Sequence, residues 1–199
     1  MAAMVSPMLE CAIASSLSDL AQAAATLRRG TDFIAAGLQS PPGRGTTRAA
    51  TGNSKVIGNG LREIDRFLSI LIDAVADGLV VDAADRRTLR SQRNTARKLT
   101  ALRTTLALAS PDDAALRAIG RSRACLFHTA GIVRHAGPHS APTHGWAHPD
   151  AATAVLPPAR FAIGDRLDVS IADLRRIGRF YDRIADDLLA LSVRKTGFD

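Results

Sequence analysis

One segment of the chain places an arginine and a histidine close together on a predicted helix. Between Ser110 and Ala136 the apolar side chains recur in steps of three and four, which is typical of a helix with one buried face. Arg123 occupies a position where this pattern calls for an apolar residue, and His128 follows five residues later. A histidine can transfer protons near neutral pH, and the guanidinium of an arginine can hold a phosphate. The pair therefore has the residue types for phosphodiester chemistry.

The position of Arg123 needs a physical reason, because a buried guanidinium without partners is costly. Three explanations are open. The side chain can reach the edge of the helix, or it can line a cleft or a subunit interface. It can also pair with an acidic residue of a neighbouring helix, such as Asp73 or Asp187.

The same helix has a face that suits a partner. Its small residues Gly120, Ala124 and Gly131 would let another helix approach closely. A second line along the helix, on which residues seven apart lie almost directly above each other, carries Arg121, Cys125, His128, Ile132 and His135. We therefore expect a homodimer, with arginine and histidine side chains near one interface of this helix.

A group of basic residues lies on another predicted helix, over residues 83–109. No acidic residue occurs between Arg86 and Pro111. Arg86, Arg90, Arg93 and Arg97 recur at helical spacing, which predicts one exposed basic ridge. Such a ridge is either a solvated helix face or a phosphate-binding face.

Other kinds of site lack their motifs. The chain has neither the GxxxxGK[ST] order of a phosphate loop nor the Gly-x-Ser-x-Gly turn of a serine hydrolase. Five histidines lie between His128 and His148, but glycines and prolines interrupt them and no cysteine or paired carboxylate accompanies them. We therefore predict no metal site.

Composition and periodicity predict a helical protein. Aromatic residues make up only 4% of the 199 residues, and long β-branched runs are few. Apolar periodicity predicts five helices, over residues 8–38, 54–79, 83–109, 110–136 and 170–192. Ser170 and Asp173 form a capping-box-like start of the last one. We expect a single all-α domain over residues 1–199, a bundle of about five helices with a flexible connection at 40–53 and one long His/Pro-rich loop at 137–158 before the last helix.

Charge and cysteine usage narrow the setting. The formal net charge is +7, with 26 Lys and Arg against 19 Asp and Glu. This excess either attracts polyanions or reflects only the Ala- and Arg-rich composition that a GC-rich genome produces. The two cysteines, Cys11 and Cys125, form no disulfide framework, which favours a reducing, cytoplasmic compartment. The first twenty residues lack the pattern of a signal peptide, and no apolar run is long enough to cross a membrane. We expect no membrane partner.

Two segments resemble a known family. The stretch from Arg123 to Val133, which contains Arg123-Ala-Cys-Leu-Phe-His128, is similar to the signature helix of the HEPN superfamily (higher eukaryotes and prokaryotes nucleotide-binding). The stretch Gly164-Asp-Arg-Leu-Asp-Val-Ser170 is similar to the entry of the last helix in several members. The resemblance covers about residues 55–192 and implies a small helical bundle.

The resemblance implies an activity. Catalytic members are metal-independent endoribonucleases, many of them toxin- or defence-like, whose arginines and histidines meet across a homodimer interface. Here Arg123 would hold the scissile phosphate, with Arg121 as a second clamp, and His128 would be the general acid or base. The resemblance implies RNA as substrate, with the ridge of Arg86, Arg90, Arg93 and Arg97 binding it without sequence preference. It also implies no metal or other cofactor, and a protein antitoxin as a partner.

Alternative functions stay open. Family members usually carry a polar residue directly after the motif arginine, and this chain has Ala124 there. The alternative is a non-catalytic helical bundle that binds a protein or nucleotide partner through the same helix. A third reading, general nucleic-acid binding through the basic ridge, lacks an aromatic stacking platform.

Overall fold

The computed structural model describes residues 46–80, 82–134 and 161–195, together with six single positions between residues 22 and 36. The continuous ranges form five helices: α2 (Thr46–Leu79), α3 (Ala83–Ser91), α4 (Thr95–Thr105), α5 (Asp113–Thr129) and α6 (Ile171–Lys195). Within these ranges there is no β-strand, and one isolated bridge joins Ile132 to Arg166. The prediction of an all-α bundle is confirmed. The helix predicted over 8–38 and the loop predicted over 137–158 lie outside the continuously described residues.

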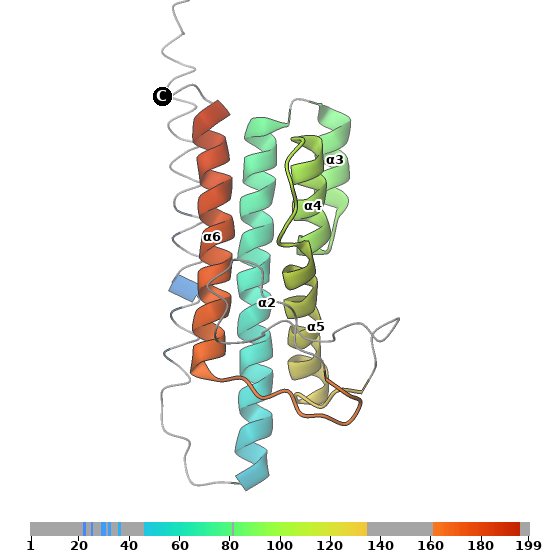
Figure 1. Cartoon of the computed structure of the whole chain (residues 1–199), viewed down its shortest axis with the longest axis vertical. Helices are drawn as coiled ribbons and strands as arrows, with labels where there is room; N and C mark the ends of the chain where they lie inside the picture. The colour runs from blue at the N-terminus through green and yellow to red at the C-terminus, as the bar shows by residue number, and fades with distance from the viewer. Residues whose placement is uncertain are drawn as a thin grey trace, which may run out of the picture.

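Helix α2 is the long central element, and it contacts each of the other four described helices. Helix α6 lies along one side of α2 and runs parallel to it, whereas α4 and α5 lie on the other side (Figure 1). Helix α5 runs antiparallel to α2, beside its N-terminal half (Figure 1). The candidate site residues of α5 are therefore positioned directly by α2.

The core forms along the seams that the sequence pattern predicts. On α2 the buried residues recur in steps of three and four: Ile57, Leu61, Ile64, Leu68, Leu71 and Val75. The matching seam of α6 consists of Leu174, Ile177, Tyr181, Ile184 and Leu188. Fully burying one such side chain contributes about 1.5–3 kcal/mol, so these seams fix how the helices are rotated about their axes. The start of α6 is also as predicted, because Ser170 and Asp173 form a capping box. The backbone N–H of each residue donates to a side-chain oxygen of the other.

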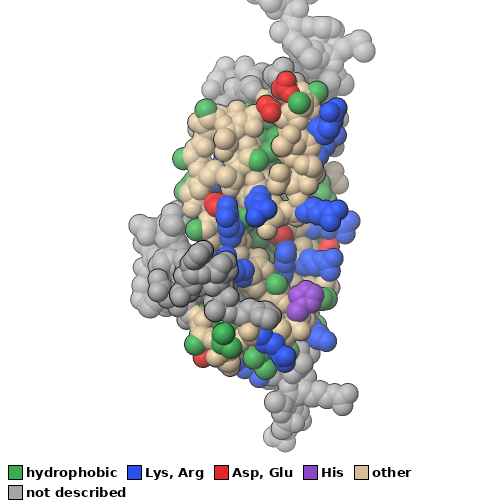
Figure 2. Space-filling view, turned by 90° about the vertical axis from the view of Figure 1, so that its right-hand side faces the viewer, with side chains coloured by type: hydrophobic (Ala, Val, Ile, Leu, Met, Phe, Trp, Pro, Cys, Tyr) green, Lys and Arg blue, Asp and Glu red, His purple; other side chains and the backbone are tan. Residues whose placement is uncertain are grey.

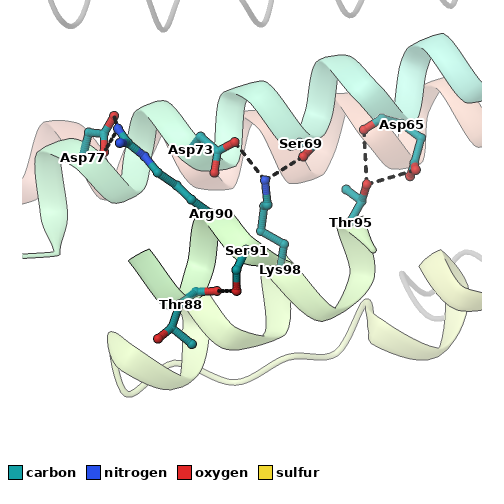
Figure 3. Close-up of polar contacts among 9 residues, drawn as sticks. All are labelled: Asp65, Ser69, Asp73, Asp77, Thr88, Arg90, Ser91, Thr95 and Lys98. Atoms are coloured by element: carbon teal, nitrogen blue, oxygen red, sulfur yellow. Dashed lines mark hydrogen bonds and ion pairs between the residues drawn. The ribbon is translucent and has the colours of Figure 1, made fainter. Parts of the chain in front are cut away.

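The single helix predicted over 83–109 is wrong. Two helices occupy this range, because the chain leaves α3 after Ser91 and starts α4 at Thr95. The side chain of Asn94 caps the new helix by accepting a hydrogen bond from the backbone N–H of Arg97 at 3.0 Å. The break lets α4 turn back along α2, where Thr95 and Lys98 find polar partners (Figure 3).

Two helix ends also differ from the prediction. Helix α2 begins at Thr46, so part of the connection predicted over 40–53 is helical. Helix α5 ends at Thr129 rather than Ala136, because Ala130 and Gly131 have left-handed backbone angles, with φ of 54° and 86°. The chain beyond α5 instead pairs with the segment before α6, where the N–H of Leu167 donates to the carbonyl of Gly131 at 2.7 Å.

Candidate functional site

Arg123 forms an ion pair with an acidic residue of the central helix. Its Nη1 lies 2.6 Å from Oδ2 of Asp65, and the two side chains are 29% and 19% exposed. This contact matches one of the three explanations for an arginine on the seam, pairing with an acidic residue of a neighbouring helix. The partner is Asp65, however, and not Asp73 or Asp187.

Asp65 connects four helices. Besides Arg123 of α5, its carboxylate accepts hydrogen bonds from Thr95 Oγ1 of α4 at 2.9 Å and from the Tyr181 hydroxyl of α6 at 3.3 Å. Burial, together with the negative charge of Asp65, raises the pKa of Tyr181 well above its ordinary value. The guanidinium of Arg123 is thus one member of a polar cluster inside the bundle.

The other two acids have their own partners. Asp73 accepts from Lys98 Nζ at 2.8 Å, and the same ammonium donates to Ser69 Oγ at 2.9 Å (Figure 3). Asp187 Oδ2 lies 3.8 Å from a guanidinium nitrogen of Arg103 and 3.8 Å from one of Arg183. The register of α5 on α2 therefore leaves Asp65 as the partner of Arg123.

His128 lies on another side of α5. It is exposed in the last turn of the helix, and its ring packs edge-on against Phe127 with the ring centroids 4.9 Å apart. Five residues of an α-helix turn through about 500°, so His128 lies about 140° around the axis from Arg123. Within one chain the structure does not bring the two motif residues to the same face.

Another line along α5 carries a different set of residues, which we call the α5 stripe: the exposed Arg117, Ala124 and His128, and the half-buried Arg121. They follow in steps of four, three and four, so they lie in one line along the helix. Burial, and the positive charge of Arg117, lower the pKa of Arg121. Arg117 also pairs with Asp113 at 2.8 Å. Of the two predicted clamps, Arg121 shares a face with His128 and Arg123 does not.

The α5 stripe is bordered by open space. A Cβ atom added at Gly120 would meet no other atom within 4 Å. The face turned toward the viewer in Figure 2 carries many Lys and Arg side chains, a histidine among them and few acidic ones. This side of the bundle thus combines positive charge with small residues.

The basic ridge predicted from Arg86 to Arg97 is not continuous. Arg90 pairs with Asp77 at 2.6 Å, and Arg86 donates to the carbonyl of Val80 at 3.2 Å, so both turn toward the C-terminal end of α2. Arg93 is exposed within the helix break, and Arg97 is exposed on α4. The four arginines cannot form one line, because the helix that would align them ends at Ser91.

A second basic line was missed by sequence reasoning. Lys55, Arg62 and Arg66 are exposed on α2, and at about 100° per residue they fall within about 40° of each other around the axis. Their spacing of seven and four residues was the available signal. It was hidden because the buried seam of the same helix dominates the pattern.

Two further properties concern metals and membranes. In the part of the chain that the structure describes, His, Cys, Asp and Glu side chains form no group of three that could hold a metal ion. Four of the five histidines lie outside that part. None of the described helices combines the length and apolar character needed to cross a membrane.

The chain was compared with protein-family models, with curated proteins and with solved structures, and no match was found in any of the three.

Proposed function

We propose that this protein is an HEPN-like, metal-independent endoribonuclease in which His128 transfers protons and Arg121 holds the scissile phosphate. The observation that carries this proposal is the α5 stripe, which places the exposed His128 and the half-buried Arg121 on one face of the helix. Imidazole supplies a base near neutral pH, and a guanidinium supplies paired donors for phosphate oxygens. The net charge of +7 favours an anionic substrate.

A second copy completes the site. Seven residues separate Arg121 from His128, which is about 10 Å along the helix axis, and side chains of a helix lean toward its N-terminus. Arg121 therefore leans away from His128 of its own chain. If two copies of α5 cross antiparallel about a two-fold axis near Ala124, His128 lies opposite the partner's Arg121. The small side chain of Ala124 and the open space at Gly120 suit this crossing.

The reaction uses the 2′-hydroxyl of the RNA as its nucleophile. Neutral His128 takes the proton of that hydroxyl as the 2′-oxygen attacks phosphorus. The bond between phosphorus and the 5′-oxygen then breaks, and this oxygen takes a proton from solvent. Arg121 stabilises the additional negative charge on the phosphoryl oxygens. The products are a 2′,3′-cyclic phosphate and a 5′-hydroxyl end, and DNA is inert because it lacks the nucleophile.

Arg123 has a supporting role in this proposal. Its ion pair with Asp65 compensates its charge and fixes α5 on α2, so it orients the helix that carries His128. This role differs from the phosphate clamp that the family resemblance implies. It also accounts for an arginine on the seam without placing it beside the substrate.

The test is cleavage of mixed single-stranded RNA by the purified full chain in EDTA. His128→Ala should lose at least about 100-fold in rate, the usual effect of removing a general base. Arg179→Ala, a charge change on the exposed side of α6, should cleave like the wild type. Equal cutting by wild type and His128→Ala, or products without cyclic phosphate ends, would contradict the proposal.

A specific observation favours a second candidate, a non-catalytic bundle that binds a protein or nucleotide partner through α5. Asp65 engages the motif arginine, and Ala124 stands where catalytic relatives usually have a polar residue. This candidate predicts partner binding that Ala124→Glu abolishes, with no RNA cleavage by the wild type. The cleavage assay above separates the two candidates.

A further inference from the structure

The exposed side of α2 changes its charge along the helix. Its N-terminal half displays Lys55, Arg62 and Arg66, and its C-terminal half displays Asp73 and Asp77. These residues lie within one sector of the helix, about 60° wide. The change of sign divides the polar side of α2 into a basic part and an acidic part.

The chain neutralises the acidic part with its own residues. Lys98 pairs with Asp73 at 2.8 Å, and Arg90 pairs with Asp77 at 2.6 Å (Figure 3). The basic part is not neutralised in the same way, although two acids lie within it. Glu63 is 3.8 Å from Arg66, and Asp65 is engaged by Arg123.

Two more arginines extend the basic part. Thr95 Oγ1 donates to the Asp65 carboxylate at 2.9 Å, which brings the start of α4 to the residue that directly precedes Arg66 in α2. Arg93 and Arg97 lie two residues on either side of Thr95, and both are exposed. Among the described residues, none of Lys55, Arg62, Arg93 and Arg97 forms an ion pair with a carboxylate. We call Lys55, Arg62, Arg66, Arg93 and Arg97 the basic track.

The basic track leads toward the candidate site. Helices α2 and α5 approach so closely that a Cβ atom added at Gly58 would lie 2.8 Å from the backbone nitrogen of Phe127. His128 is the next residue along α5. Gly58 lies between Lys55 and Arg62 in sequence. The part of the track on the N-terminal half of α2 therefore runs beside the end of α5 that carries His128. Lys55 and Arg66 are about 16 Å apart along the helix axis, which is long enough to follow several phosphates of one strand.

We propose that the basic track binds the phosphate backbone of single-stranded RNA and guides it to His128. The identity of the polymer rests on the proposed function, but the charge pattern does not. The members of the track are Lys and Arg, which contact phosphates through charge, and binding therefore depends steeply on salt and little on base sequence.

The test measures binding without cleavage. The probe is a fluorescently labelled single-stranded DNA oligonucleotide, which has the same backbone charge and no 2′-hydroxyl, titrated with the full chain at several salt concentrations. Two double variants remove track charges: Arg62→Gln with Arg66→Gln, and Arg93→Gln with Arg97→Gln. The matched control is Arg175→Gln with Arg179→Gln, which removes two charges from the exposed side of α6.

Each track variant should weaken binding at low salt about 10-fold or more. Each should also reduce the slope of log K against log salt by about 1.4, or roughly 0.7 for each lost phosphate contact. The control should change affinity less than about twofold, because its charges lie away from the contacted strand. Equal weakening by all three variants would mean diffuse attraction and would overturn the track, as would no binding by the wild type at low salt. Equally tight binding of a polyglutamate peptide, lost in the same variants, would overturn RNA as the ligand.

The outcomes separate this proposal from the proposed function. If no RNA is cleaved but the track variants still lose binding, the ribonuclease proposal fails and the track stands. If RNA is cleaved but the track variants bind normally, the track fails and the ribonuclease proposal stands.

Discussion

The guanidinium of Arg123 and the carboxylate of Asp65 lie 2.6 Å apart, although 58 positions separate the two residues in the chain. This contact fixes the rotation of α5 against α2. It turns Arg123 toward the bundle and leaves His128 on an exposed side of α5. The face of α5 that carries His128 is therefore set by an ion pair on another side of the helix.

Removing the Asp65 carboxylate should destabilise the bundle. In Asp65→Ala, Arg123 loses its partner and the Tyr181 hydroxyl loses its acceptor, which should cost about 2 kcal/mol in the free energy of unfolding. Tyr181→Phe removes one 3.3 Å hydrogen bond and should cost about 1 kcal/mol. Urea unfolding measures both. Equal stability of Asp65→Ala and wild type would show that the cluster contributes nothing.

Tyr181 should resist ionisation. Burial, and next the negative charge of Asp65, raise its pKa well above the ordinary value, so the folded state keeps its proton where the unfolded state loses it. The contribution of protonated Tyr181 to the free energy of unfolding is therefore complete below about pH 10, and it is lost as the pH rises from there through the folded pKa. Tyr181 is the one tyrosine in the chain, so the ultraviolet absorbance of tyrosinate reports it alone. Ionisation of the folded protein at the ordinary pKa would contradict the burial described above.

Two glycines of α2 should respond to alanine in opposite directions. At Gly58 the added Cβ would lie 2.8 Å from the backbone nitrogen of Phe127, so Gly58→Ala must push α5 away and should destabilise by about 2 kcal/mol. At Gly78 the added Cβ meets nothing within 4 Å, and Gly78→Ala should stabilise by about 0.5 kcal/mol through helix propensity. Thermal unfolding of the pair is the measurement. A gain in stability at Gly58 would mean that α2 and α5 are farther apart than described.

The face around Ala124 should hold the second copy. Sedimentation of the wild type should give a dimer, and Ala124→Glu should give a monomer, because two carboxylates would meet at the two-fold axis. Ala190→Glu, at an exposed position of α6, is the control and should remain dimeric. A monomeric wild type, or a dimer that Ala124→Glu leaves intact, would contradict a site shared between two copies.

The sequence pattern was sufficient for the bundle and for its seams. Leu61, Leu68 and Leu71 follow helical spacing, and burial of one face is the dominant local signal. The same signal concealed the break before Asn94, because Leu89, Leu99 and Leu102 stay buried on both sides of it. Apolar periodicity reports which side faces the core, and it does not report whether the chain between two buried residues is straight.

The candidate site was only partly accessible to sequence reasoning. The pattern correctly marked Arg123 as unusual, since polar residues on a seam need partners. It could not select Asp65 among the acids of the chain, because that choice depends on the register of two helices distant in sequence. The shared face of Arg121 and His128, in contrast, follows from their spacing of seven residues alone, and the sequence predicted it.

The central claim is a site made of His128 from one copy and Arg121 from the other, and mixing two inactive variants tests it most directly. Arg121→Ala and His128→Ala should each fail to cleave RNA in EDTA. After subunit exchange, half of the dimers are mixed and each has one intact site, so the mixture should regain about a quarter of the wild-type rate. A mixture that stays inactive while the wild type cleaves would contradict the shared site.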